Sequence, residues 1–267
     1  MIGVIVGDIA GSIYEFNNFK SKKFPLFGKG CNYTDDSIMA LAVAKALMDH
    51  PDKKYLYEGA LREDFVRAMR DLGKKYPFPM GAYGGSFSKW LRAENPKPYN
   101  SWGNGSAMRV AACGWVADSF DEAVRLGRCS AEVTHNHPEG IKGAQCVAGC
   151  IYLARTGHSK EWIKSTVELM FYPLKESCDE IRKHYHFDSS CQGTVPQAIQ
   201  AFLEAESFED AIRNAISLGG DADTLAAITG GIAEAYYGVP DDIAAKATDY
   251  LPYDLLDILL EFEEKYQ

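Results

Sequence analysis

The sequence predicts an all-α protein in which residues 1–267 form a single domain. Apolar residues recur at helical spacing along most of the chain, and no alternating strand pattern runs for more than a few residues. Ser, Thr, Asp or Pro stands at the start of many of these apolar segments, as is typical of helix N-termini. Hydrophobic residues make up 46% and charged residues 24% of the chain, which indicates a globular protein with a sizeable core.

The first expected helix spans residues 2–16. Glycine occurs at every fourth position from Gly3 to Gly11, so one stripe of this helix has no side chains and another helix can approach it closely. Glu15 falls near the end of this helix. The Lys-, Phe- and Gly-rich residues 20–30 then predict a surface loop that is long enough to be a lid.

Thr34 is the expected N-cap of the next helix, which runs to about His50 and is ended by Pro51. Ser119 and Glu122 have the spacing of a capping box before a later helix. The other segments with helical spacing are residues 61–72, 87–91, 101–117, 123–134, 138–153, 159–170, 177–185, 196–203, 209–218 and 225–236, followed by two helices that begin near residues 240 and 252.

The overall charge and the cysteine pattern argue against several classes of protein. The net charge of -9 and the pI of ≈ 5.2 disfavour general nucleic-acid binding, which needs a basic face. The seven cysteines include no Cys-x-x-Cys pair, and Cys146 and Cys150 are expected on one face of a core helix. No segment resembles a signal peptide or is apolar for long enough to span a bilayer, so a cytoplasmic protein without a membrane partner is expected.

Two acidic motifs open helices near opposite ends of the chain. A glycine pair precedes Asp221, Asp223 and Thr224, and residues 34–36 repeat the pattern as Thr-Asp-Asp. The ordinary explanation is capping, because Asp and Thr accept hydrogen bonds from unpaired amides at a helix N-terminus. If the motifs meet, however, their carboxylates repel each other unless a cation bridges them. Ligands that are all oxygen suit Mg²⁺ or Mn²⁺ rather than zinc.

Two glycine-rich segments, residues 84–86 and 103–106, could present backbone amides to a pyrophosphate at a helix N-terminus. Neither segment matches a P-loop or a dinucleotide fingerprint, and ordinary turns are the alternative. The neighbouring Trp102 could stack on an adenine, or it could belong to the core.

Three further polar residues are candidates for a functional role. His135 and His137 could form part of a zinc site, but no additional ligands are evident, so a substrate contact by His135 is favoured. Glu15 could be a general base with a raised pKa, or it could be a surface acid where the first helix ends. The sequence alone does not decide between these roles of Glu15.

Together and in this order, several motifs resemble those of the ADP-ribosylglycohydrolase family. They span almost the whole chain and are residues 7–15 (GDIAGSIYE), 34–37 (TDDS), 83–85 (YGG), 103–109 (GNGSAMR), 134–135 (TH) and 219–224 (GGDADT). The resemblance implies an orthogonal all-α bundle and a binuclear Mg²⁺ or Mn²⁺ centre. It also implies that the substrate is an ADP-ribosylated protein or small molecule.

The resemblance further implies roles for individual residues. The implied metal ligands are Thr34, Asp35, Asp36, Asp221, Asp223 and Thr224. Glu15 is similar to the glutamate that acts at the glycosidic bond, and Asp36 is the next candidate for water activation. The implied substrate-binding residues are Gly84, Gly85, Ser86, Ser101, Trp102, Gly103, Asn104, Gly105, Ser106, Met108 and His135.

Three functions compete for this set of residues. The first is a hydrolase that cleaves the N- or O-glycosidic bond between ADP-ribose and an acceptor, with a water held by a cation or by Glu15 attacking the anomeric carbon. The second is a non-catalytic ADP-ribose-binding or structural member of the family, and the intact set of acids argues against it. The third is a two-metal phosphoesterase. The released product (ADP-ribose, nothing or AMP) distinguishes these functions, and the sequence leaves the acceptor open.

Overall fold

The computed structural model describes residues 1–50 and 58–267, and these residues form α-helices joined by turns and loops. In the described part, strand-like pairing is limited to two isolated bridges, Thr34–Met80 and Gly103–Ser190. The helices in chain order are α1 (Ile2–Gly11), α2 (Asp35–Met48), α3 (Glu58–Lys75), α4 (Gly85–Arg92), α5 (Gly105–Met108), α6 (Ala111–Val116), α7 (Phe120–Glu132), α8 (Pro138–Arg155), α9 (Lys160–Met170), α10 (Cys178–His184), α11 (Cys191–Leu203), α12 (Phe208–Ser217), α13 (Ala222–Tyr237), α14 (Asp241–Thr248) and α15 (Tyr253–Tyr266). The predicted all-α class is confirmed.

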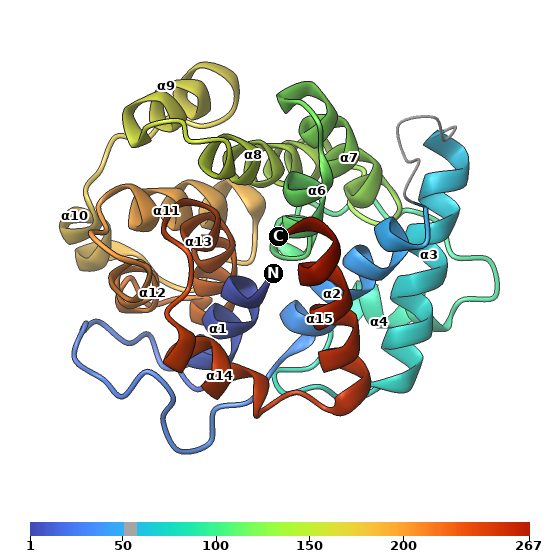
Figure 1. Cartoon of the computed structure of the whole chain (residues 1–267), viewed down its shortest axis with the longest axis horizontal. Coiled ribbons are helices and arrows are strands. Elements are labelled where there is room, and N and C mark those ends of the chain that lie inside the picture. The colour runs from blue at the N-terminus through green and yellow to red at the C-terminus, as the bar shows by residue number, and fades with distance from the viewer. Residues whose placement is uncertain (51–57) are drawn as a thin grey trace.

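Helices α1 and α13 pack against each other near the centre of the molecule (Figure 1). Every residue of α1 is buried. A Cβ atom added to Gly7 would lie 2.0 Å from the backbone oxygen of Ala226, and one added to Gly3 would lie 2.4 Å from that of Gly230. The predicted close approach of another helix to the glycine stripe is therefore confirmed, because the backbones of α1 and α13 are in contact there.

Replacing Gly7 by alanine is expected to destabilise the protein by about 3 kcal/mol, the upper end of the usual cost of overpacking, because the added methyl group meets backbone rather than a movable side chain. Urea unfolding measures the change in free energy. Gly85→Ala is the matched control, since a Cβ there meets nothing within 4 Å. Equal stabilities of the two variants would contradict the close approach of α1 and α13.

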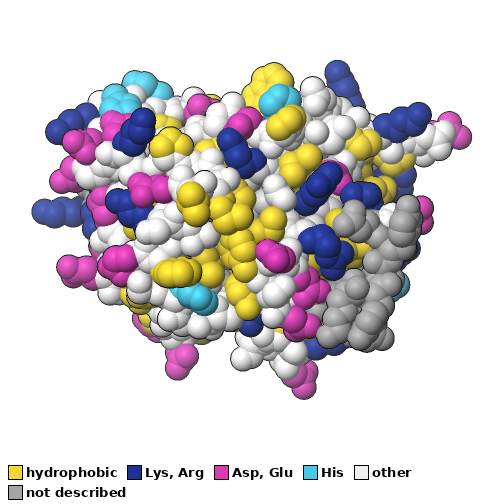
Figure 2. Space-filling view, turned by 90° about the horizontal axis from the view of Figure 1, so that it is seen from above, with side chains coloured by type: hydrophobic (Ala, Val, Ile, Leu, Met, Phe, Trp, Pro, Cys, Tyr) yellow, Lys and Arg dark blue, Asp and Glu magenta, His cyan; other side chains and the backbone are white. Residues whose placement is uncertain are grey.

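The remaining helices surround this pair. Helix α2 packs against α3 and α15, α7 packs against α8, and α11 and α12 pack against α13. One cluster of buried apolar side chains contains members from α1 to α15. No helix among residues 1–50 and 58–267 is long and apolar enough to cross a membrane. On the face shown in Figure 2, the described Lys and Arg side chains are interspersed with Asp and Glu, and hydrophobic side chains form a band across its middle.

The predicted helix over residues 2–16 is wrong at its end, because α1 stops at Gly11 and turns continue to Asn18. Polar side chains take over the carbonyl groups there: Ser12 Oγ donates to the oxygen of Ile9 at 2.8 Å, and Asn17 Nδ2 donates to that of Ile13 at 2.6 Å. Glu15 consequently lies on a turn beyond the helix.

Three other predicted boundaries differ from the structure. Residues 101–117 form two short helices, α5 and α6, instead of one. Helix α11 begins at Cys191, well before Pro196, because Ser190 caps it by accepting a hydrogen bond from the amide of Gly193 at 3.1 Å. Helix α2 ends at Met48, and the predicted stop at Pro51 lies outside the described residues.

The capping box predicted at Ser119 is half formed. Ser119 Oγ accepts a hydrogen bond from the amide of Glu122 at 3.1 Å. The carboxylate of Glu122, however, accepts from the amide of Asp118 at 2.7 Å, one residue before the cap. The helix α7 therefore starts where predicted, with a modified pattern of hydrogen bonds.

The loop of residues 20–30 is a tethered segment and not a free lid. Lys20 Nζ donates to the backbone oxygens of Tyr185 and Leu218, each at 2.5 Å. Lys22 pairs with Asp210 at 2.5 Å. These contacts tie the loop to the end of α10, to the first turn of α12, and to Leu218, which lies just before the acidic motif at Asp221.

Candidate active site

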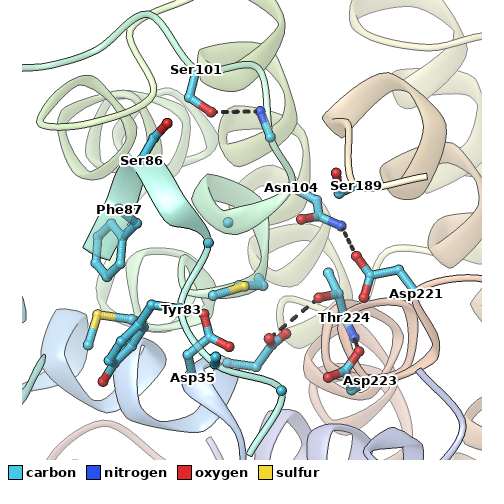
Figure 3. Close-up of a pocket in the computed structure, with 18 of the residues that line it drawn as sticks. Asp35, Tyr83, Ser86, Phe87, Ser101, Asn104, Ser189, Asp221, Asp223 and Thr224 are labelled. Atoms are coloured by element: carbon cyan, nitrogen blue, oxygen red, sulfur yellow. Dashed lines mark hydrogen bonds between the residues drawn. The ribbon is translucent and has the colours of Figure 1, made fainter. Parts of the chain in front are cut away.

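A cavity of about 430 Å³ opens where the N-termini of α2 and α13 meet the turn that follows α1. Residues before α4, α5 and α11 complete its wall. Most of the predicted site residues line it, namely Glu15, Asp35, Asp36, Gly84, Gly85, Ser86, Ser101, Gly103, Asn104, Gly105, Met108, His135, Asp221, Asp223 and Thr224. Figure 3 shows the acidic side chains at one end of this cavity and the two serines, Ser86 and Ser101, toward the other.

The acidic end contains two overlapping groups of carboxylates. One oxygen each of Asp8, Asp36 and Asp223 lie within 4.8 Å of one another, and the same holds for Glu15, Asp221 and Asp223. Asp223 belongs to both groups, so the groups adjoin. The two acidic motifs, far apart in the sequence, therefore meet in the folded chain.

A tight turn aims Asp221 into the cavity. Gly219 and Gly220 have φ angles of 74° and 71°, a conformation that favours glycine, and a Cβ at Gly219 would lie 2.5 Å from Asn18 Oδ1. Although Asp221 is the N-cap residue of α13, its side chain makes no capping hydrogen bond. It accepts instead from Asn104 Nδ2 at 2.7 Å. Ordinary helix capping therefore does not explain Asp221.

At the N-terminus of α2, capping and the acidic cluster coexist. Thr34 Oγ1 accepts from the amide of Asp36 at 3.2 Å and donates to Asp8 Oδ1 at 2.6 Å. Asp8 also accepts from the amides of Thr34 and Ser37, at 2.9 and 3.1 Å, and from the Ser37 hydroxyl. Thr34 is fully buried and is not among the residues that line the cavity. Among the implied metal ligands, it alone lies behind the wall.

Asp8 is the main residue that sequence reasoning missed as a site residue. It lies inside the apolar helix α1, is fully buried and accepts hydrogen bonds from Thr34 and Ser37 at the α2 N-terminus. A carboxylate on a glycine-striped, wholly apolar helix needs a partner, because burying an unpaired charge is costly. That signal was present in the sequence.

The electrostatics of the acidic cluster indicate that it needs positive charge. Burial raises the pKa values of Asp35, Asp36 and Asp223 well above the usual carboxyl range, and neighbouring carboxylates raise them further. Asp36 Oδ1 is buried without a hydrogen-bond partner. A divalent cation would compensate this charge, and the donor atoms, all of them oxygens, fit a hard ion such as Mg²⁺ or Mn²⁺. These residues therefore fit a metal centre.

Glu15 projects from the turn after α1 toward the same cluster. Burial, followed by the charges of Asp221 and Asp8, raises the pKa of Glu15 to about 7. A Cβ at Gly81 would lie 2.8 Å from Glu15 Oε2, so glycine at this position makes room for the carboxylate. The carboxylate is half-buried, in contrast to those of Asp36 and Asp223. Glu15 and Asp35 are therefore the two acids lining the cavity that are only partly buried.

Comparison with known proteins settles the classification. The sequence model of a family described as ADP-ribosylglycohydrolase matches residues 1–266. The chain belongs to the ADP-ribosylglycohydrolase family. The resemblance stated from the motifs is thereby confirmed, and the chain is an enzyme of the glycohydrolase type.

Several relatives named as hydrolases of ADP-ribosyl groups match along nearly the whole chain. It is 24% identical to ADP-ribosylhydrolase ARH3 of Homo sapiens, with 96% of this chain and 90% of that protein covered. The ADP-ribosylarginine hydrolase Tri1 of Pseudomonas putida (strain GB-1) is 28% identical, with 90% and 70% covered. The ADP-ribosyl-[dinitrogen reductase] glycohydrolase of Rhodospirillum rubrum is 26% identical, with 90% and 85% covered.

A solved structure named as an ADP-ribosylglycohydrolase-related protein complex has the same fold. It aligns with a TM-score of 0.68 at 21% identity and covers 99% of this chain and 95% of that one. The expected orthogonal bundle of the ADP-ribosylglycohydrolase type is therefore confirmed.

Both glycine-rich segments of this ADP-ribosylglycohydrolase line the cavity. Ser86 of the first segment lies toward the end away from the acids, whereas Asn104 of the second lies beside Asp221 (Figure 3). A Cβ at Gly84 or Gly85, at the N-terminus of α4, would meet nothing within 4 Å. A Cβ at Gly105 or Gly103 would lie 3.2 or 3.4 Å from His135 Nε2. The first segment offers open backbone, and the second lies beside an imidazole.

Two predicted substrate-binding residues, Trp102 and Ser106, and the histidine His137 are not among the residues that line the cavity. Trp102 is 52% exposed and packs edge-on against His137, with ring centroids 5.4 Å apart. Ser106 Oγ donates to the oxygen of Gly140 at 2.7 Å and so holds the loop before α5 from behind. His137 caps α8 by accepting from the amide of Glu139 at 3.1 Å. In the described part of the chain, no histidine belongs to either group of potential metal ligands.

Replacing Trp102 by alanine is therefore expected to change the affinity for ADP-ribose by no more than about two-fold, the usual range for a surface substitution. Calorimetry measures the affinity. Phe187→Ala is the matched comparison, because Phe187 is equally exposed, at 50%, but lines the cavity. A ten-fold loss in Trp102→Ala would show that the indole does contact the adenosine.

An aromatic pair at the mouth of the cavity had no signal in the sequence. Phe16 and Phe187 are 72% and 50% exposed, and their rings stack with centroids 5.8 Å apart. Both line the cavity beside Glu15. Phe16 stands at the end of the helix predicted over residues 2–16 and Phe187 in an irregular segment, and a lone phenylalanine at either position indicates nothing about a binding site.

Proposed function

We propose that this chain is a binuclear, Mg²⁺- or Mn²⁺-dependent hydrolase that cleaves the N- or O-glycosidic bond between ADP-ribose and an acceptor. The observation that carries the proposal is the junction of two carboxylate groups at Asp223, beside Glu15, in one cavity with two glycine-rich segments. The names of the relatives, which are hydrolases of ADP-ribosyl groups, support the substrate class.

Residues from both acidic motifs would hold the cations. They are Asp35 and Asp36 from the start of α2, with Thr34 behind them, and Asp221, Asp223 and Thr224 from the start of α13. Asp8 accepts four hydrogen bonds from Thr34 and Ser37, so we assign it to holding the α2 N-terminus in place. Divalent cations at such a centre supply positive charge that orients ribose hydroxyls and stabilises charge developing in the transition state.

Glu15 is the proposed general base. In the proposed reaction, a water oxygen bonds to the anomeric carbon while the bond from that carbon to the acceptor breaks, and a proton of the water passes to the Glu15 carboxylate. The acceptor leaves with the bonding electron pair and takes up a proton, which Glu15 or solvent water returns, so the products are free ADP-ribose and the neutral acceptor. Glu15 suits this role because its carboxylate is only partly buried and lines the cavity, whereas Asp36 is buried among its neighbours. Asp36 is the second candidate for this role.

The other end of the cavity is proposed to hold the ADP portion. The open N-terminus of α4, with Gly84, Gly85 and Ser86, suits a diphosphate, because unpaired amides and the helix dipole favour anions. Ser101, Met108 and the loop from Gly103 to Gly105 are proposed to contact the nucleoside, and His135 the ribose. All seven cysteines are buried and stand outside any disulfide, which supports a reducing compartment such as the cytoplasm.

A product assay tests the proposal. The protein is incubated with ADP-ribosylated arginine, serine and guanidine compounds, with Mg²⁺ or with EDTA, and the products are separated. The expected result is release of ADP-ribose from at least one acceptor in the presence of Mg²⁺ and loss of release in EDTA. Release of AMP would show a phosphoesterase instead. Binding of ADP-ribose without turnover on any acceptor would show a non-catalytic member of the family.

A further inference from the structure

Three polar side chains form a buried row behind the Gly103–Gly105 loop. Arg109, Thr134 and His135 are 1%, 0% and 6% exposed. Arg109 Nη2 donates to Thr134 Oγ1 at 2.8 Å, and Thr134 Oγ1 lies 2.7 Å from His135 Nδ1. The row comes from the break between α5 and α6 and from the end of α7, and its two outer members, Arg109 and His135, line the cavity.

The protons along this row can be assigned from hydrogen-bonding chemistry. A guanidinium only donates, so Thr134 Oγ1 accepts from Arg109 and its own proton needs another acceptor. Nδ1 of His135 is the nearest basic atom, and a hydroxyl that accepts from a cation becomes a better donor. The Tyr99 phenol also hydrogen-bonds with the Thr134 side chain, but its oxygen is a weaker acceptor than an imidazole nitrogen, so the Thr134 proton is assigned to Nδ1.

Donation from Thr134 to Nδ1 determines the protonation of the other ring nitrogen, Nε2. If Nδ1 accepts, the neutral imidazole must carry its proton on Nε2. Nε2 faces the loop, because a Cβ at Gly105 would lie only 3.2 Å from it. Burial and the nearby Arg109 charge lower the pKa of His135 well below its usual value, which keeps the ring neutral.

We propose that Arg109 and Thr134 are positioning residues that hold His135 as its neutral Nε2–H tautomer, so that a bound ligand meets a hydrogen-bond donor at this wall of the cavity. The proposal deepens the proposed function, because its ligand is the oxygen-rich ADP-ribose. An acceptor nitrogen at the same place would repel the oxygens of a ribose or a diphosphate.

The charge of Arg109 favours the same class of ligand. In the part of the chain that the structure describes, Arg109 makes no ion pair with a carboxylate, and its Nε is buried without a hydrogen-bond partner. Its Nη2 is held by the backbone oxygen of Ser130 and by Thr134. A buried cation without a counter-ion is costly, and it makes the adjoining wall attractive to an anion.

Heteronuclear NMR of the histidine ring nitrogens at about pH 8, where an ordinary imidazole is neutral, tests the assignment. The His135 signals are identified with a His135→Gln variant. His137 is an internal reference, because its Nδ1 accepts from the amide of Glu139 and its proton must therefore lie on Nε2. The wild-type protein is expected to show the same pattern for His135 as for His137.

Three variants then test the separate roles of Thr134 and Arg109. Thr134→Val removes the hydroxyl at nearly constant volume, so His135 should lose its tautomer preference and the affinity for ADP-ribose should fall about ten-fold, the worth of one hydrogen bond. Arg109→Met should shift the tautomer in the same direction. Thr134→Ser keeps the hydroxyl and should restore both properties, and it serves as the folded comparison if the valine variant is unstable.

A proton on Nδ1 in the wild-type spectrum would overturn the proposal, whether or not the protein binds ADP-ribose. An unchanged tautomer in Thr134→Val would remove Thr134 from the row, and a lost tautomer with unchanged affinity would show that the ligand does not use this donor. If the wild-type protein neither binds nor releases ADP-ribose but shows the Nε2–H pattern, the proposed function fails and the tautomer assignment stands.

Discussion

Glu15→Gln is expected to lower kcat by roughly 10²–10⁴-fold, the usual contribution of a general base. Glutamine has nearly the same shape as glutamate but cannot take a proton from water. Glu15 lies on a turn with its carboxylate open to the cavity, so the change should leave the fold and the neighbouring acids in place. Steady-state kinetics on the acceptor that turns over best in the product assay measures the effect.

The affinity for ADP-ribose should remain close to that of the wild type in Glu15→Gln, because the residue is proposed to act on water and not on the ADP portion. Glu168→Gln, an exposed position on α9, is the matched control and should be fully active. An increase confined to KM would assign Glu15 to substrate binding. Wild-type turnover would exclude Glu15 and make Asp36 the next residue to replace.

Asp223→Asn is expected to abolish the response of the protein to divalent cations. Mg²⁺ should raise the Tm of the wild type and EDTA should lower it, because a cation that binds only the folded state stabilises that state. Asp223 belongs to both carboxylate groups, so one substitution weakens both. Calorimetric unfolding with and without Mg²⁺ measures the response, and activity on the chosen acceptor should fall with it.

The same variant should be more stable than the wild type in EDTA. Without a cation, Asp223 is a buried carboxylate whose pKa is raised by burial and by Asp221, so its removal relieves repulsion in the folded state. Asp257→Asn, an exposed position on α15, removes the same charge without either effect and is the control. Equal Mg²⁺ responses in Asp223→Asn and the wild type would rule out the proposed metal centre.

The sequence predicted most of the helices and most of the residues that line the cavity. Helices with a regular apolar stripe and a polar cap, such as α2, α8 and α9, start where the pattern indicates. The errors lie where side chains override the pattern: polar groups end α1 early, and the Ser190 cap starts α11 before its proline. Such competition between local hydrogen bonds and apolar periodicity is not visible in spacing alone.

The candidate site shows a similar division. The sequence predicted a shared cation for Asp221, Asp223 and the Thr-Asp-Asp motif at residues 34–36, because acids recur at two helix N-termini. Trp102 looked equally suited to adenine, but it lies exposed against His137. An aromatic residue next to a glycine loop has no preferred direction until the loop is folded.

By itself, the sequence determined the all-α class, the close approach of the first helix through its glycine stripe, and the types of ligand atom in the acidic motifs. These depend on periodicity and side-chain chemistry, which are local. Only the tertiary structure decided that Asp8 joins the acids, that Asn104 holds Asp221, and that Phe16 stacks on Phe187. Each of these contacts joins segments distant along the chain, and packing of the whole core determines which distant segments meet.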